Sequence, residues 1–215
     1  MMNFFQRLAQ RAREVDSLLC VGLDPRGTNA DAVRDECFRL IDATAEAACA
    51  FKPNSAFFEA LGAQGWQVLR DVIAHVPAGI PVILDAKRGD IADTAQAYAA
   101  AAFDQLRAHA ITVNPYLGGE ALRPFLARPN CGAFVLCKTS NPGADEFQGG
   151  VIQAEGGALY EVVARHACDW NVNGNVGLVA GARSVAAGSR RGRARRRSAD
   201  RVARGPARRR PGRAD

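Results

Sequence analysis

The sequence predicts an α/β protein built on a parallel sheet. Six short apolar runs recur along the chain, at 18–23, 48–51, 80–86, 110–114, 132–137 and 175–181. Segments with helical periodicity lie between them, and this alternation is typical of successive βα units. Polar side chains follow five of the runs: Asp24, Lys52, the cluster at Asp85, Asn114 and Thr139–Ser140. Because the carboxyl ends of parallel strands share one face, we expect these side chains to converge there.

Each predicted helix has an apolar face. The first, at 1–15, places Phe4, Phe5 and Leu8 together and lacks the uninterrupted apolar core of a signal peptide. The helix predicted at 31–49 has an apolar face made of Val33, Cys37, Leu40, Ile41 and Ala48. The corresponding face at 66–76 is made of Trp66, Leu69, Ile73 and Val76. At 157–168 it is made of Leu159, Val162, Val163 and His166. The helix predicted at 92–108 is alanine-rich.

Charge divides the chain into two parts. The formal net charge is +6, but residues 183–215 contain 13 Arg and 2 Asp, a balance of +11, so residues 1–182 carry 6 − 11 = −5. The body is mildly acidic and only the tail is basic. The sequence therefore predicts no nucleic-acid binding except through that tail.

The cysteines and the hydropathy pattern predict a cytoplasmic protein. The 6 cysteines include no C-x-x-C pair and have no His at ligand spacing, which disfavours a metal site. We expect reduced thiols, mostly in the core. No apolar run approaches the ~18 residues that a membrane span requires, so no membrane association is expected.

The stretch ILDAKRGDIADT, at 83–94, places a charged array directly after a predicted strand. Asp85, Lys87 and Asp90 form the pattern D-x-K-x-x-D, and alternation along a strand points Asp85 and Lys87 to the same side. An ammonium beside a carboxylate keeps both groups ionised and can supply a proton. A solvated loop in which Asp90 or Asp93 caps the next helix explains the same spacing.

LDAKRGDIADT resembles the signature of the orotidine 5′-phosphate decarboxylase family, in its bacterial, mycobacterial-like branch. The resemblance continues, in the expected order, through VGLDP at 21–25, FKPNSAFFE at 51–59, VNPYLGGEAL at 113–122 and CKTSNPGADEFQ at 137–148. It implies a (β/α)8 TIM barrel that forms a homodimer, binds a small-molecule nucleotide and uses neither metal nor cofactor. The implied reaction converts orotidine 5′-monophosphate to UMP and carbon dioxide in pyrimidine biosynthesis.

The resemblance also implies roles for individual residues. Lys87 protonates C6 of the pyrimidine, Asp85 lies against the departing carboxylate, and Lys52 holds Asp85 and the ribose hydroxyls. Asp90 reaches into the partner subunit's site, with Ile91 and Thr94 beside it. The implied substrate-binding residues are Asp24 for the ribose, Ser140 for the pyrimidine, and Asn114 and Thr139 at their strand exits.

The resemblance stops at about residue 182, after about six βα units. Residues 183–215 are mostly Arg, Ala and Gly, with no aromatic residue, Leu or Ile, and such a composition predicts disorder. We expect residues 1–182 to form an incomplete barrel domain, with open edges at its first and sixth strands. The tail reads as an out-of-frame segment, a hypothesis that the DNA sequence across codon 182 tests. Because no phosphate-binding loop follows, we expect this chain to have little or no activity.

Two alternatives remain open from the sequence. Sugar-phosphate lyases and synthases of the same superfamily also carry D-x-K-x-x-D, although the TSNPGA loop favours the nucleotide enzyme. A non-enzymatic protein that binds nucleic acid through its basic tail is the alternative of a different class.

Overall fold

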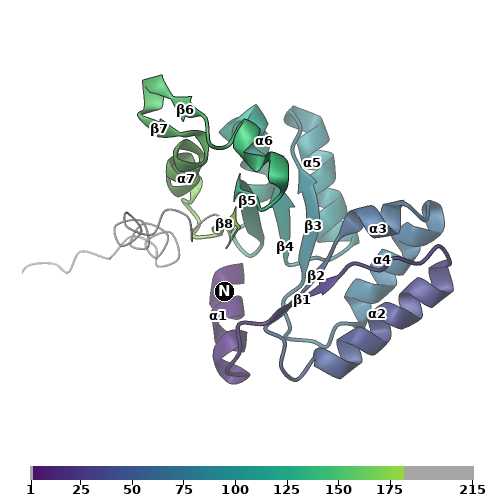
Figure 1. The fold of residues 1–215 in the computed structure, drawn as a ribbon. Coiled ribbons are helices and arrows are strands. Elements are labelled where there is room, and N and C mark those ends of the chain that lie inside the picture. Colours follow the sequence, from purple (N-terminus) through teal and green to yellow (C-terminus); the bar gives the residue numbers. More distant parts are fainter. Residues whose placement is uncertain (1, 182–215) are drawn as a thin grey trace, which may run out of the picture.

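The computed structural model describes residues 2–181, and the predictions made for residues 183–215 lie outside that range. All six predicted strands form (Figure 1). Their bounds are β1 Cys20–Leu23, β2 Ala50–Pro53, β3 Ile83–Arg88, β4 Ala110–Val113, β5 Gly132–Lys138 and β8 Val176–Ala180. The apolar runs in the sequence thus located every strand of the parallel sheet to within a few residues.

The six strands are parallel and follow the order β1-β2-β3-β4-β5-β8. Ladders join β1 to β2, and join β3, β4, β5 and β8 in that order. The bridges Phe51–Val82 and Asn54–Asp85 connect the two groups. All four residues of the central strand β4 are buried, as expected for a parallel sheet covered on both faces. Among the described strands β1 and β8 each have one neighbour, so they form the edges of the sheet. This arrangement agrees with the predicted six βα units.

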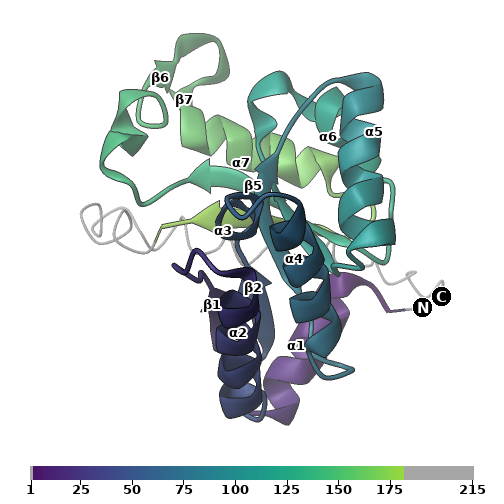
Figure 2. The same cartoon turned by 90° about the vertical axis from the view of Figure 1, so that its right-hand side faces the viewer.

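Helices follow the strands and cover the sheet (Figures 1 and 2). Their bounds are α2 Ala30–Thr44, α3 Ser55–Glu59, α4 Ala63–His75, α5 Ala92–Ala100, α6 Gly119–Leu126 and α7 Leu159–Trp170. Helix α5 continues as a π-helical turn, Ala101–Gln105. The placement of Trp66 in the buried face of α4 was wrong, because its side chain is exposed while Val68, Leu69 and Val72 are buried.

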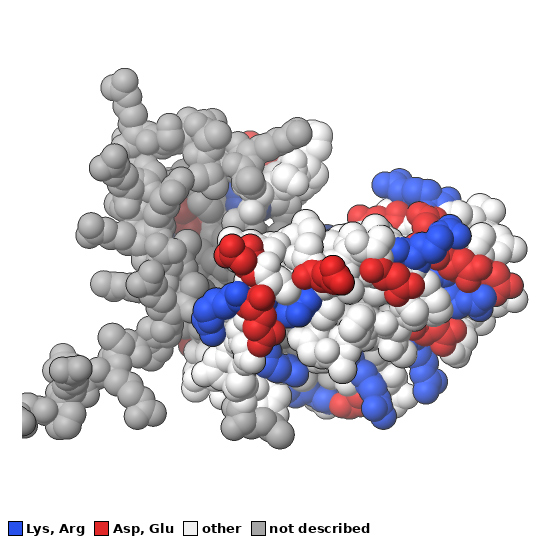
Figure 3. All heavy atoms as spheres, turned by 90° about the horizontal axis from the view of Figure 1, so that it is seen from below, with Lys and Arg blue, Asp and Glu red and all other residues white. Residues whose placement is uncertain are grey.

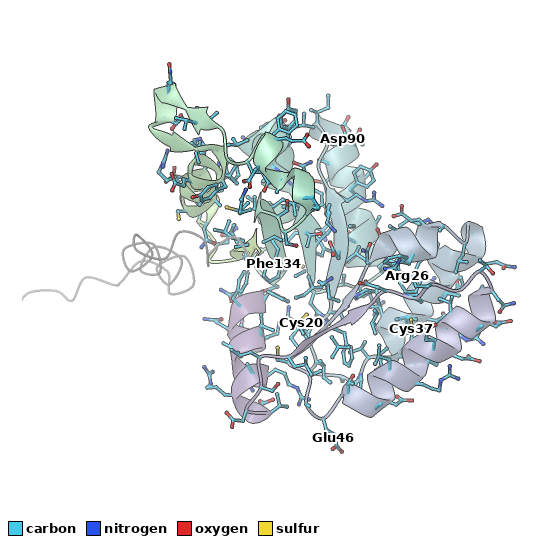
Figure 4. All side chains as sticks on the ribbon, viewed as in Figure 1. Cys20, Arg26, Cys37, Glu46, Asp90 and Phe134 are labelled. Carbon is cyan, nitrogen blue, oxygen red and sulfur yellow. The ribbon has the colours of Figure 1, made fainter. Side chains whose placement is uncertain are left out.

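The first helix, α1 (Phe4–Glu14), packs across the amino-terminal ends of the strands. Asn3 caps it with a reciprocal bond to Gln6, and Phe4 is fully buried. The rings of Phe4 and Phe134 meet edge to face, with centroids 5.8 Å apart. Figure 4 shows Phe134 next to the end of α1. At the other end of the helix, Arg11 donates to the carbonyl oxygen of Ala48 at 3.2 Å, just before β2. Helix α1 therefore contacts both halves of the sheet.

An excursion that the sequence did not predict separates β5 from α7. It contains the 3-10 turns Pro142–Glu146 and Gln153–Glu155 and the short antiparallel strands β6 (Val151–Ile152) and β7 (Gly157–Ala158). Figures 1 and 2 show this hairpin projecting beyond α7. Another 3-10 turn, Pro115–Leu117, follows β4. Strands of two residues are too short to give a readable alternation.

The surface carries charges of both signs. Acidic and basic side chains are interspersed on the face shown in Figure 3, without a basic stripe along the described part of that face. No helix within residues 2–181 is long and apolar enough to span a membrane. Of the cysteines expected mostly in the core, Cys37, Cys49 and Cys137 are buried, Cys131 is partly buried, and Cys20 and Cys168 are exposed.

Candidate active site

The charged array lies on an irregular end of β3. Leu84 is opposite Ile111 in β4, but Arg88 is opposite Val113, so four residue steps in β3 match two in β4. Lys87 has a φ of +49°, in the left-handed region that non-glycine residues rarely adopt. Such bulges redirect side chains and are common near functional sites. Simple alternation was therefore the wrong reason to expect Asp85 and Lys87 on one side.

Asp85 lies between two lysines. Lys87 Nζ is 2.7 Å from Asp85 Oδ1, and Lys52 Nζ is 3.1 Å from Asp85 Oδ2. Burial raises the pKa of Asp85, but the hydrogen bond from Lys87, the charge of Lys52 and a hydrogen bond from Thr112 outweigh it, so the pKa is lowered overall. The carboxylate is therefore ionised at neutral pH, and its two oxygens are committed to different lysines.

Thr112 belongs to this site, although no sequence pattern singled it out. Its hydroxyl donates to Asp85 Oδ1 at 2.9 Å and accepts from the backbone N–H of Lys87 at 2.9 Å. A threonine inside the apolar run AITV reads as an ordinary strand residue. The one available signal was its position two residues before the polar Asn114.

Arg88 fixes the end of β3 to two helices. Its guanidinium pairs with Glu59 at the end of α3 and lies 5.0 Å from the centre of the Tyr98 ring in α5. Its carbonyl oxygen accepts from the backbone N–H of Asn114 at 2.8 Å. A Cβ on the neighbouring Gly89 would lie 2.7 Å from the Asn114 carbonyl oxygen, so this close approach requires glycine. Arg88 thus holds the bulged segment in place.

The structure does not bring Asp90, Ile91 and Thr94 into contact with the charged group formed by Lys52, Asp85 and Lys87. Asp90 lies at the opposite end of the strands from Cys20, and its carboxylate accepts from the Ile91 N–H at 2.8 Å (Figure 4). Ile91 is the N-cap of α5 without a side-chain bond, so neither Asp90 nor Asp93 caps that helix. Ile91 and Thr94 are exposed. Within residues 2–181 none of these three side chains hydrogen-bonds to or forms an ion pair with Lys52, Asp85 or Lys87.

The other predicted residues lie at their strand exits. Asp24 is exposed after β1, and the side chain of Asn114 caps the turn at Pro115 by accepting from the Tyr116 N–H. Thr139 Oγ1 donates to Asn141 Oδ1 at 2.6 Å and accepts from Gln148 Nε2 at 2.8 Å, while Ser140 is exposed. Asn114 and Thr139 therefore order their own loops, whereas Asp24 and Ser140 present polar groups at the surface.

The chemistry available here is proton transfer beside a fixed negative charge. The side chain of Lys87 is about half exposed, whereas that of Asp85 is largely buried. An ammonium that is anchored and still accessible can stabilise an anion forming next to it and can protonate it. No group of three or more His, Cys, Asp or Glu side chains in the described range could hold a metal ion.

The chain resembles proteins of one family over most of its length. The profile of the orotidine 5′-phosphate decarboxylase / HUMPS family matches residues 17–202, which extends past residue 182. The orotidine 5′-phosphate decarboxylase of Roseiflexus sp. (strain RS-1) is 52% identical over 190 residues, covering 84% of this chain and 69% of the relative. That of Roseiflexus castenholzii is 49% identical over 195 residues, covering 86% and 71%.

Solved structures give the same result. The Leishmania donovani OMP decarboxylase superposes with a TM-score of 0.82 at 57% identity, covering 86% of this chain and 73% of that one. An orotidine 5′-phosphate decarboxylase homologue from Streptomyces avermitilis gives 0.78 at 34% identity, covering 85% and 70%. The chain belongs to the orotidine 5′-phosphate decarboxylase / HUMPS family, with an α/β fold of the TIM-barrel type.

Proposed function

We propose that this chain acts as an orotidine 5′-phosphate decarboxylase, a carboxy-lyase that converts orotidine 5′-monophosphate to UMP and carbon dioxide. The observation that carries the proposal is the contact of both Lys52 and Lys87 with the largely buried carboxylate of Asp85. Relatives bearing that name, at about half identity over most of the chain, support it over a sugar-phosphate lyase or a nucleic-acid-binding protein.

Lys87 supplies the proton. The bond between C6 of the pyrimidine and the carboxylate carbon breaks, carbon dioxide leaves, and the electron pair stays on C6. The Lys87 ammonium stabilises that developing charge more than it stabilises the bound substrate, and then transfers its proton to C6. Its accessible position, 2.7 Å from Asp85, suits this role because the ion pair with the carboxylate anchors and aims the ammonium.

The remaining residues orient the substrate. Asp85 lies against the departing carboxylate, and Lys52 holds Asp85 from its second oxygen and reaches the ribose hydroxyls. Asp24 binds the ribose, and Ser140 hydrogen-bonds the pyrimidine. Because the side chains of Asn114 and Thr139 are engaged in their own loops, we assign them to shaping those loops around the substrate.

We further propose that the protein works as a cytoplasmic homodimer in which Asp90, Ile91 and Thr94 complete the partner's site. The exposure of Ile91 and Thr94, and the lack of a bond from Asp90 to the array of its own described chain, support this assignment. Mixing Lys87→Ala with Asp90→Ala tests it. If Asp90 acts in the other subunit, hybrid dimers contain one intact site, and activity reappears on mixing. A mixture as inactive as its components contradicts it.

Carbon dioxide release from orotidine 5′-phosphate by the purified chain tests the function. We expect release that Lys87→Ala abolishes and that Arg70→Ala, at an exposed position on α4, leaves unchanged. Circular dichroism establishes that all three proteins are folded. The sequence alone predicted little or no activity because of residues 183–215, which lie outside the described residues. Release by the wild-type chain would show that this prediction is wrong. Release that persists in Lys87→Ala, or no release at all, contradicts the proposed function of this polypeptide.

A further inference from the structure

Thr112 is a polar residue where packing alone calls for an apolar one. It lies within β4 between Ile111 and Val113, with only 4% of its surface exposed. Valine has nearly the same shape and would fill this position without a polar atom. Burying a hydroxyl costs free energy unless it is hydrogen-bonded, so the two bonds that Thr112 makes indicate a role beyond packing.

Those two bonds belong to a closed ring of three contacts. The Lys87 N–H donates to Thr112 Oγ1 at 2.9 Å, and that hydroxyl donates to Asp85 Oδ1 at 2.9 Å. Lys87 Nζ reaches the same Oδ1 at 2.7 Å and closes the ring. A hydroxyl can donate one hydrogen bond, and an ionised carboxylate can only accept, so the Thr112 hydroxyl donates to Asp85. The direction of every bond in the ring is therefore determined.

The ring also supplies a hydrogen-bond acceptor to the irregular backbone of β3. In a regular ladder the N–H of Lys87 would bond a carbonyl oxygen of the neighbouring strand, but the bulge shifts the register at this point. The Thr112 hydroxyl takes the place of that acceptor. Lys87, with a φ of +49°, is held in a conformation that is strained for a non-glycine residue and needs support from its surroundings.

We propose that Thr112 is a positioning residue, which sets the conformation of the Asp85 carboxylate and of the Lys87 backbone so that the Lys87 ammonium is aimed at the reacting carbon. It acts through Asp85 and Lys87. The effect of Thr112 on turnover rests on the proposed function, whereas its effect on the conformation of Asp85 and Lys87 does not.

The contribution of Thr112 to the pKa of Asp85 can be separated from the contributions of the two lysines. The groups that lower the pKa of Asp85 against burial are Lys87, Lys52 and the Thr112 hydroxyl. Removing the hydroxyl leaves both lysines in place. We therefore expect Thr112→Val to raise the pKa of Asp85 and Thr112→Ser, which keeps the hydroxyl, to restore it.

The first test uses the free protein and does not depend on activity. NMR titration of the Asp85 carboxyl carbon and hydrogen exchange of the Lys87 amide are measured for wild type, Thr112→Val and Thr112→Ser. We expect a higher pKa and faster exchange in the valine variant only. Thr112→Ala, which adds no second methyl group, replaces it if the valine variant does not fold. Thr44→Val, which removes a hydroxyl bonded to the Leu40 carbonyl oxygen in α2, is the control. An unchanged Asp85 pKa and Lys87 exchange in Thr112→Val or Thr112→Ala overturns the proposal.

The second test measures turnover of orotidine 5′-phosphate. Because a hydrogen bond to a charged group is lost, we expect kcat to fall about 10-fold or more in Thr112→Val. KM should change little, and Thr112→Ser should regain most of the rate. An equal kcat in Thr112→Val overturns the positioning role. A wild-type chain without turnover instead contradicts the proposed function, and the NMR result then decides the role of Thr112 by itself.

Discussion

Lys52 and Asp85 form an ion pair of 3.1 Å across the junction between β2 and β3, although 33 residues separate them in the chain. Asn54, directly after β2, pairs with Asp85 in β3 through a parallel β-bridge. Lys52 comes two residues before Asn54 and therefore lies on the same face of its strand. The pair therefore lies where the two halves of the sheet meet. A change at Lys52 acts on Asp85 directly.

Replacing Lys52 with glutamine should raise the pKa of Asp85. Burial acts to raise that pKa and is opposed by Lys87, Lys52 and Thr112, so removing one lysine shifts the balance toward burial. In the wild type, ionised Asp85 contributes stability at pH values above its ordinary pKa of 3.8, and this is lost as the pH falls through the lowered native value. NMR titration of the Asp85 carboxyl carbon measures the shift. An Asp85 pKa equal to that of wild type would show that Lys52 has no electrostatic role.

His109 should make folding stability depend on pH. Its Nδ1 accepts from the backbone N–H of Val82 at 3.0 Å, so the neutral ring is required, and burial lowers its pKa below 6.5, with Arg7 adding to the effect. The unfolded chain binds more protons in this range. Stability is therefore complete above pH 6.5 and decreases as the pH falls toward the lowered native pKa. Urea unfolding between about pH 5 and 8 measures this.

The matched variant is His109→Asn, whose side-chain amide oxygen lies at the same distance along the side chain as Nδ1, can accept the same bond and does not titrate. It should show a smaller loss of stability over the same pH range. A loss equal to that of the wild type would assign the effect to other groups.

Phe4 should contribute far more to stability than an exposed phenylalanine. It is fully buried at the amino-terminal ends of the strands, where its ring packs on Gly132 and Phe134. Phe147, in contrast, is 74% exposed. Phe4→Ala should lower the free energy of unfolding by about 3–5 kcal/mol. Phe147→Ala should change it by about 0.5 kcal/mol or less. Denaturant unfolding measures both, and equal effects would mean that α1 does not form part of the core.

The open edge of β1 should promote self-association. Leu18, 88% exposed, and Leu19 lead into β1, which pairs only with β2 among the described strands. Unprotected edges pair with other chains, and a lysine on an edge opposes this. Leu18→Lys should therefore reduce association in light scattering. Val172→Lys is the control, because Val172 is equally exposed, at 87%, but lies in a loop. Equal scattering from the two variants would contradict an edge effect.

The amino-acid pattern predicts where the strands lie along the chain and which charged residues follow them. Alternating apolar runs and amphipathic segments located the six parallel strands and most helices, because burial on a parallel sheet demands continuous apolar runs. The charges after those runs marked Asp85, Lys87 and Lys52. Short elements such as α3, β6 and β7 were missed, since so few residues carry no readable period.

The tertiary structure alone decided how those residues meet. The bulge at the end of β3 depends on the shifted pairing with β4, and the left-handed Lys87 has no sequence signal comparable to a glycine. Thr112 and Arg88 acquired their roles only from residues distant in the chain, Asp85 and Glu59 respectively. Hydrogen bonds and ion pairs act over about 3 Å, and only folding brings residues from β2, β3 and β4 within that distance.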